Sequence, residues 1–138
     1  MGRGPGLTLF VDASALVAMI TNEPERDRFR QTVLADAESL WSAMSCWETV
    51  SAVRKRGTLS VPEARALVEE SAELLGLRLV DVGSTELIAA LDAYQTYGRN
   101  SGHPAKLNMG DCFAYACAKT HNASLLYKGN DFLHTDLA

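Results

Sequence analysis

The chain has 138 residues, of which 47% are apolar and 22% charged, and its 13 basic and 17 acidic side chains give a formal net charge of −4. These values are typical of one soluble globular domain and exclude a disordered chain. The negative charge also excludes a protein that holds nucleic acid by bulk positive charge, so a phosphate-bearing partner must be bound locally. We expect a single domain over residues 1–138.

Cysteine content and apolar run lengths indicate the compartment. The three cysteines form no C-x-x-C pair, which favours a reducing cytoplasm over a disulfide framework or a zinc knuckle. No stretch reaches the roughly 18 uncharged apolar residues of a transmembrane helix. The apolar run at 7–11 is shorter than the roughly 7–15 residues of a signal-peptide core. We therefore expect a cytoplasmic protein without membrane contact.

The N-terminal half alternates strand and helix signals. The apolar run at 7–11 follows a Gly-Pro-Gly turn, and this combination predicts a buried strand that ends at Asp12. The other elements expected in this half are helices at 13–20 and 25–36, a strand at 39–43, and a helix at 45–56 that Gly57 stops.

The C-terminal half continues the alternation. Ser60-x-x-Glu63 is a capping box that predicts the start of a helix, and Gly76 is expected to end that helix. The remaining expected elements are a strand at 77–82, helices at 85–97 and 110–121, and a strand at 124–128. Strands that alternate with helices long enough for crossovers predict an α/β fold with a mainly parallel sheet.

Four acidic residues lie in apolar or glycine-rich surroundings, namely Asp12, Glu48, Asp111 and Asp131. An isolated ionised carboxylate in such surroundings is costly unless a helix N-terminus or a cation compensates it. Several of these residues follow apolar segments whose ends share one edge of a parallel sheet. Carboxylates gathered there would be bridged by Mg²⁺ or Mn²⁺, which prefer oxygen ligands.

Each of these acids also has a purely structural interpretation. Asp12 fits a helix N-cap, and Ser45-x-x-Glu48 and Asn108-x-x-Asp111 both fit the capping-box pattern. The pair Asn130-Asp131 fits an ordinary turn. Spacing alone leaves both interpretations open.

Four segments in chain order resemble the signatures of PIN-domain ribonucleases, and more narrowly the VapC toxins of bacterial type II toxin–antitoxin systems. They are FVDASAL at 10–16, SCWETV at 45–50, LNMGDCFAYA at 107–116 and LLYKGNDF at 125–132. The resemblance runs from Leu9 to the C-terminus. It implies a three-layer α/β/α sandwich, a metal-dependent endoribonuclease activity, a homodimer, and inhibition by a small antitoxin.

The resemblance also assigns residues. Asp12, Glu48 and Asp111 fall on acidic positions of the family, and Asp12 and Asp111 are expected to bind Mg²⁺ or Mn²⁺. Asp131 is the expected fourth acid. The adjacent Asn130 is the alternative, which would leave three carboxylates and an amide and would favour one ion over two. Ser14 is expected to support Asp12 by a hydrogen bond.

The mechanism implied is hydrolysis of an RNA phosphodiester. The ion would attract a phosphate oxygen and lower the pKa of the water that attacks phosphorus. Lys128 precedes the turn at Asp131 and is expected to contact a phosphate. Aromatic side chains for base stacking are few, which favours recognition of RNA by shape.

Two other functions fit parts of the sequence. The first is a noncatalytic PIN-like domain that binds RNA or a protein partner. The second is a phosphotransfer enzyme in which Asp12 takes a phosphoryl group. It is disfavoured because Ser14 stands where a dehalogenase-like enzyme needs a second aspartate.

Overall fold

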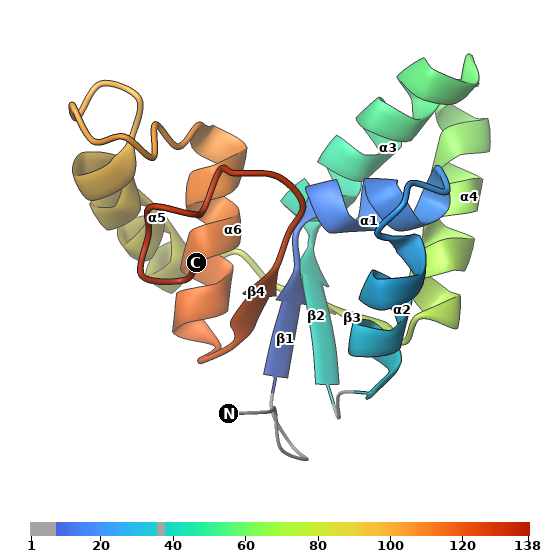
Figure 1. Cartoon of the computed structure of the whole chain (residues 1–138), viewed down its shortest axis with the longest axis horizontal. Helices are drawn as coiled ribbons and strands as arrows, with labels where there is room; N and C mark the ends of the chain where they lie inside the picture. The colour runs from blue at the N-terminus through green and yellow to red at the C-terminus, as the bar shows by residue number, and fades with distance from the viewer. Residues whose placement is uncertain (1–7, 36–37) are drawn as a thin grey trace.

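A computed structural model describes residues 8–35 and 38–138, which form four strands and six helices in the alternating order that the sequence predicts (Figure 1). The strands are β1 (Thr8–Val11), β2 (Glu38–Ser42), β3 (Leu77–Val80) and β4 (Ser124–Leu126). The helices are α1 (Ala13–Ile20), α2 (Arg26–Ala35), α3 (Ala43–Gly57), α4 (Val61–Leu74), α5 (Ser84–Tyr97) and α6 (Met109–Thr120). Leu7 and Asp36, predicted to lie in the first strand and second helix, fall outside the described residues.

The four strands form one parallel sheet in the order β3-β2-β1-β4. In the centre of the sheet, Phe10 of β1 pairs with Leu40 of β2 on one side and with Leu125 of β4 on the other. The chain runs outward from β1 to β3 and returns on the opposite side of β1 as β4. Ligands of open α/β sheets bind where the strand order reverses in this way, and Asp12 is the first residue after β1.

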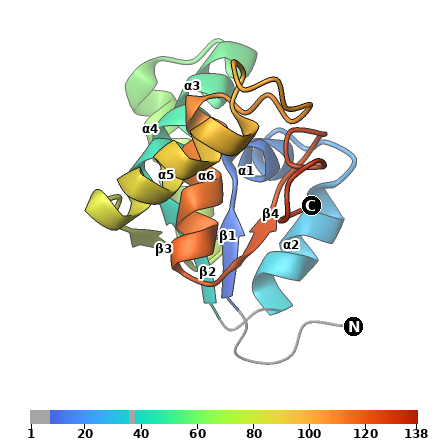
Figure 2. The same ribbon diagram turned by 90° about the vertical axis from the view of Figure 1, so that its left-hand side faces the viewer.

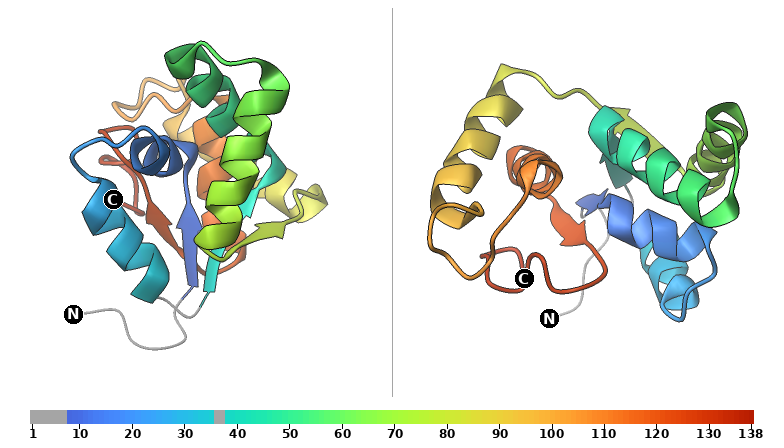
Figure 3. Two further views of the ribbon diagram at one scale, coloured as in Figure 1. Left: turned by 90° about the vertical axis from the view of Figure 1, so that its right-hand side faces the viewer. Right: turned by 90° about the horizontal axis from the view of Figure 1, so that it is seen from above.

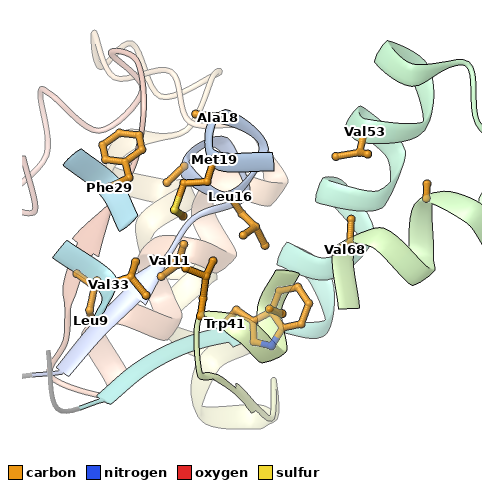
Figure 4. Close-up of a cluster of buried hydrophobic side chains, with 14 residues drawn as sticks. Leu9, Val11, Leu16, Ala18, Met19, Phe29, Val33, Trp41, Val53 and Val68 are labelled. Atoms are coloured by element: carbon orange, nitrogen blue, oxygen red, sulfur yellow. The ribbon is translucent and has the colours of Figure 1, made fainter. Parts of the chain in front are cut away.

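Helices cover both faces of the sheet, and the fold is therefore the predicted α/β/α sandwich. The helices α1 to α4 lie on one face and α5 and α6 on the other (Figures 2 and 3). Because strand side chains alternate between faces, neighbouring residues enter different cores. Leu9, Val11 and Trp41 pack with the first helical layer (Figure 4), whereas Phe10 and Leu40 pack with α5 and α6.

The start of α3 differs from the sequence prediction. The helix begins two residues earlier than expected because Ser42 is its N-cap, and the Ser45 backbone N–H donates to the Ser42 Oγ at 3.2 Å. The capping box predicted for Ser45 and Glu48 is therefore wrong, and the Glu48 carboxylate is free of that cap. The helix also includes Gly57 as its last residue, and its C-cap is Thr58, whose φ of 54° is left-handed.

Other helix ends follow the sequence signals. Ser60 and Glu63 form the predicted capping box of α4, and Gly76 follows that helix with a φ of +70°. Asn108 and Asp111 form a capping box at the start of α6. No helix within residues 8–35 and 38–138 is long and apolar enough to cross a membrane.

Candidate active site

The N-terminal ends of α1, α3 and α6 lie near the carboxyl ends of the strands (Figure 1). Asp12 caps α1, Glu48 lies in the second turn of α3, and Asp111 lies in the first turn of α6. The charges of Asp12 and Glu48 both act on Asp111, and the charge of Asp12 acts on Glu48. Residues 99 positions apart in the sequence, from 12 to 111, are therefore brought into one electrostatically coupled cluster.

Asp12 is the most enclosed acid of this cluster, with only 7% of its surface exposed. Its Oδ2 accepts hydrogen bonds from the Ser14 backbone N–H at 3.0 Å and from the Ser14 hydroxyl at 2.5 Å. The Ser14 Oγ in turn accepts a hydrogen bond from the backbone N–H of Lys128 at 3.0 Å. Burial raises the pKa of Asp12 and the charge of Asp131 adds to that rise, while the Ser14 hydrogen bonds oppose it. Ser14 thus fixes the orientation of Asp12 and links α1 to the segment after β4.

Glu48 lies against the first turn of α6. A Cβ atom at Gly110 would lie 2.2 Å from Oε2 of Glu48 and 2.9 Å from its Oε1. Both distances are shorter than van der Waals contact, so the carboxylate occupies space that any other residue at this position would fill. Burial, followed by the charge of Asp12, raises the pKa of Glu48 to about 7.

Asp111 has a structural and an electrostatic role together. Its backbone N–H donates to the Asn108 Oδ1 at 2.8 Å, and its own Oδ2 accepts from the Asn108 backbone N–H at 3.2 Å. Burial raises the pKa of Asp111 to about 7, with further increases from the charges of Asp131, Asp12 and Glu48. The capping interpretation of Asp111 is therefore correct, and it does not exclude the site interpretation.

The fourth acid lies in the turn after β4. Gly129 has a φ of +96°, a conformation that favours glycine, and Asn130 and Asp131 follow it at the surface. The charge of Asp131 raises the pKa of both Asp12 and Asp111. The backbone carbonyl of Asn130 accepts a hydrogen bond from Leu133 at 3.2 Å. Asp131 therefore adds negative charge to the cluster, and its choice over Asn130 as the fourth group stays a prediction.

The chemistry of this donor set suits a hard divalent cation. Carboxylate oxygens are the preferred ligands of Mg²⁺ and Mn²⁺, and a cation between carboxylates that raise one another's pKa would relieve their repulsion. Within the described parts of the chain, no group of three or more His, Cys, Asp or Glu side chains is arranged to hold an ion as it stands. The donor set therefore fits the ion by its chemistry, and the carboxylates would have to move closer to ligate it together.

Lys128, predicted to contact a phosphate, forms ion pairs within the chain. Its ammonium forms ion pairs with Glu23 and with Glu25, the second at 3.4 Å, and Arg56 also binds Glu23 at 2.9 Å. The hydrogen bond to Glu23 is the main cause of the raised pKa of Lys128. Two carboxylates thus engage the ammonium in this structure, and the phosphate contact stays a prediction. The part of Lys128 that joins the site is its backbone N–H.

The sequence prediction missed the surroundings of Glu48. Trp47 is 72% exposed and Met109 is 69% exposed, and both line a groove that also includes Glu48. The available signal was the position of Trp47 next to Glu48, one turn after Met44 on the same helix. That spacing does not reveal exposure, because the neighbouring elements that could cover a helix are distant in sequence.

Comparisons with known proteins identify the family of the chain. The model of the PIN domain family matches residues 9–137, so the chain belongs to the PIN domain family. A VapC ribonuclease of Rhizobium meliloti is 38% identical over an alignment of 139 positions, which covers 93% of this chain and 98% of that protein. Ribonuclease VapC30 of Mycobacterium tuberculosis is 42% identical over 130 residues, covering 94% of this chain and 96% of that protein.

Solved structures share the fold at low sequence identity. The VapBC2 complex of Rickettsia felis, bound to a promoter DNA fragment, contains a chain with a TM-score of 0.72 and 11% identity, with 95% of each chain covered. The toxin VapC20 of Mycobacterium tuberculosis, which cleaves the sarcin–ricin loop, has a TM-score of 0.68 and 12% identity, covering 91% of this chain and 92% of that one. These matches support the α/β/α architecture.

Proposed function

We propose that this protein is a Mg²⁺- or Mn²⁺-dependent endoribonuclease that acts as the toxin of a type II toxin–antitoxin pair. The observation that carries the proposal is the placement of Asp12, Glu48 and Asp111 at the N-terminal ends of α1, α3 and α6, at the carboxyl edge of the sheet. The Glu48 carboxylate lies there against the backbone of Gly110, beside Asp111. Relatives named as VapC ribonucleases, 34–42% identical over most of the chain, support the same activity.

Each site residue has a defined part in this activity. Asp12 and Asp111 would hold the ion, with Glu48 and Asp131 completing the acidic pocket. A bound Mg²⁺ or Mn²⁺ supplies a positive centre for a phosphodiester oxygen and lowers the pKa of a water molecule. The hydrogen bonds from Ser14 hold the Asp12 Oδ2 in place. Without a cation, the four carboxylates would repel the RNA backbone.

The proposed biological setting is the cytoplasm, with a cognate VapB-like antitoxin and a second copy of the chain as partners. A toxin–antitoxin complex of Klebsiella pneumoniae contains a chain of the same fold, with a TM-score of 0.68 and 14% identity. Exposed apolar side chains on α5, among them Leu87, Ile88 and Leu91, are the kind of surface that proteins use for association.

The decisive test is loss of RNA cleavage in two conservative variants. Asp12→Asn and Asp111→Asn each remove one charge, and the amide oxygen can still accept the hydrogen bonds that these residues receive. We expect cleavage of total RNA in Mn²⁺ to fall at least about a hundredfold because the ion loses a ligand. Thermal unfolding should change little.

Asp92→Asn is the matched control because Asp92 is an exposed aspartate of α5, and this variant should cleave as the wild type does. Full cleavage by both site variants would overturn the proposal. Retained RNA binding by the wild type without any Mg²⁺- or Mn²⁺-dependent product would instead establish the noncatalytic alternative.

A further inference from the structure

An apolar groove adjoins the acidic site. It has a volume of about 480 Å³, and its lining includes Met44, Trp47, Val82 and Met109 together with Glu48 and Gly110. The last two residues also belong to the acidic site, where the Glu48 carboxylate lies against the backbone at Gly110. The groove is therefore continuous with the site, and among the lining residues that the structure describes Glu48 alone carries a charged side chain.

The two tryptophans of the chain have opposite environments. Trp41 is 6% exposed and packs in the core between the sheet and the first helical layer (Figure 4). Trp47 is 72% exposed and lies beside the groove. Met44, Trp47 and Glu48 are spaced three and four residues apart, so they share one face of α3. An aromatic ring held at the surface next to a reactive site is suited to bind the flat face of a ligand.

We propose that Trp47 stacks on a nucleobase of the RNA substrate, in a nucleotide that flanks the phosphodiester held at the acids. This inference rests on the proposed ribonuclease function and adds a base-binding subsite to it. An RNA chain whose phosphate lies beside Glu48 must pass the groove that Glu48 lines. The apolar walls suit an uncharged base and do not suit a phosphate.

Glu48 lines both the groove and the acidic site, and this favours a substrate over a permanent protein partner as the occupant of the groove. A protein segment that filled the groove permanently would cover Glu48 and close the acidic site. In an active nuclease the groove must therefore be open when substrate binds. Stacking on every kind of base is possible because each has a π-face, so Trp47 would provide affinity and position with little selectivity for sequence.

The first experiment is steady-state cleavage of a short single-stranded RNA of mixed sequence in Mn²⁺. We expect Trp47→Ala to raise KM by about 5- to 150-fold, the range that one stacked base contributes to affinity, with a much smaller change in kcat. Trp47→Phe should recover most of the affinity because it keeps a ring. Trp47→Leu should behave as Trp47→Ala does, since it keeps apolar surface without a π-face.

Leu74→Ala is the matched control. Leu74 is 75% exposed on α4 and lines a different pocket, with Met19 and Ile20 of α1, so its loss should leave KM unchanged. Thermal unfolding of all variants should match the wild type because these side chains contribute little to the core. If the wild type cleaves RNA and both Trp47→Ala and Trp47→Leu keep its KM, the stacking inference fails alone. If the wild type cleaves no RNA, the proposed function fails.

The second experiment measures fluorescence of the Asp12→Asn variant in saturating Mn²⁺, where the ion still neutralises the acids and cleavage is expected to be at least about a hundredfold slower. Trp47 is the exposed tryptophan, so its emission should be quenched by the RNA and not by an abasic oligonucleotide of equal length. Sedimentation of the same samples tests a protein partner. RNA that fails to quench, together with a dimer that Trp47→Ala dissociates, would assign the groove to a second copy of the chain and overturn the inference.

Discussion

Because Gly110 has no side chain, it leaves the space that the Glu48 carboxylate occupies. A substitution at Gly110 therefore tests the position of Glu48 directly. In Gly110→Ala the new methyl group would lie 2.2 Å from the Glu48 Oε2. The flexible end of the glutamate can move away, so the fold should survive while the acid is displaced. We expect RNA cleavage to fall roughly tenfold to a hundredfold, as for other displacements of about 1 Å in active sites.

The variant should be at least as stable as the wild type, because alanine is favoured over glycine within a helix by about 1 kcal/mol. The measurements are kcat on RNA and urea unfolding. Gly83→Ala is the matched control, since a Cβ at Gly83 has its nearest neighbour at 3.7 Å. Wild-type cleavage by Gly110→Ala would show that Glu48 tolerates displacement and is not needed in its present position.

Single residues also show why the site could be predicted only in part. The four acids were singled out because each lies in apolar or glycine-rich surroundings, and the alternation of strands and helices predicts that several of them share one edge of the sheet. The pairing of Lys128 with Glu23 could not be found, because it joins residues separated by 105 positions. Local sequence carries no information on such a contact.

At the scale of elements, the start of α3 determines where Glu48 lies. Ser42 ends β2 and caps α3, and both Ser42 and Ser45 are buried. Ser42→Ala removes the hydroxyl that accepts from the Ser45 backbone N–H. We expect the free energy of unfolding to fall by about 1 kcal/mol, within the usual range of about 0.5–2 kcal/mol for a lost N-cap.

Urea unfolding measures this loss directly. Ser60→Ala is the comparison, because Ser60 caps α4 at an exposed position away from the site. Both variants should lose similar stability, and only Ser42→Ala should also weaken RNA cleavage through the displaced first turn of α3. Equal cleavage by the two variants would show that the Ser42 cap does not determine the position of Glu48.

The same helix shows the limit of reading caps from sequence. Ser45-x-x-Glu48 matches the capping-box pattern better than Ser42-x-x-Ser45, yet the second pair forms the cap. The tertiary structure decides, because β2 extends to Ser42 in register with Val80 of β3 and the helix must begin directly after it. No strand in the described part of the chain ends at Ser60, so no other start of α4 competes with the capping box Ser60-x-x-Glu63. This predicted capping box was confirmed.

At the scale of the whole molecule, the acidic cluster should make stability depend on pH. The pKa values of Glu48 and Asp111 are both raised to about 7, above the roughly 4 of an unfolded chain. Their contribution to the free energy of unfolding is therefore fully present below about pH 4 and is lost as pH rises through about 7. The metal-free protein should lose this contribution as the pH rises from about 4 to about 7.

Mg²⁺ or Mn²⁺ should restore the stability that the metal-free protein loses as the pH rises. A cation binds the ionised carboxylates of the folded state, so it should raise the Tm more at about pH 8 than at about pH 5.5, where protons compete. Differential scanning fluorimetry with excess Mn²⁺ or with a chelator measures both shifts. The Asp12→Asn variant should show a smaller shift with Mn²⁺. Equal shifts at the two pH values would contradict a carboxylate site for the ion.

The strand order has a consequence for the synthesis of the protein on the ribosome. Translation completes β1 early, but its neighbour β4 and the turn that carries Asp131 come more than a hundred residues later. A nascent chain that ends before residue 131 therefore lacks part of the acidic cluster, however well its first strands have paired. Under the proposed function the acidic site becomes complete only after synthesis has passed β4, so partial chains on the ribosome should not cleave RNA.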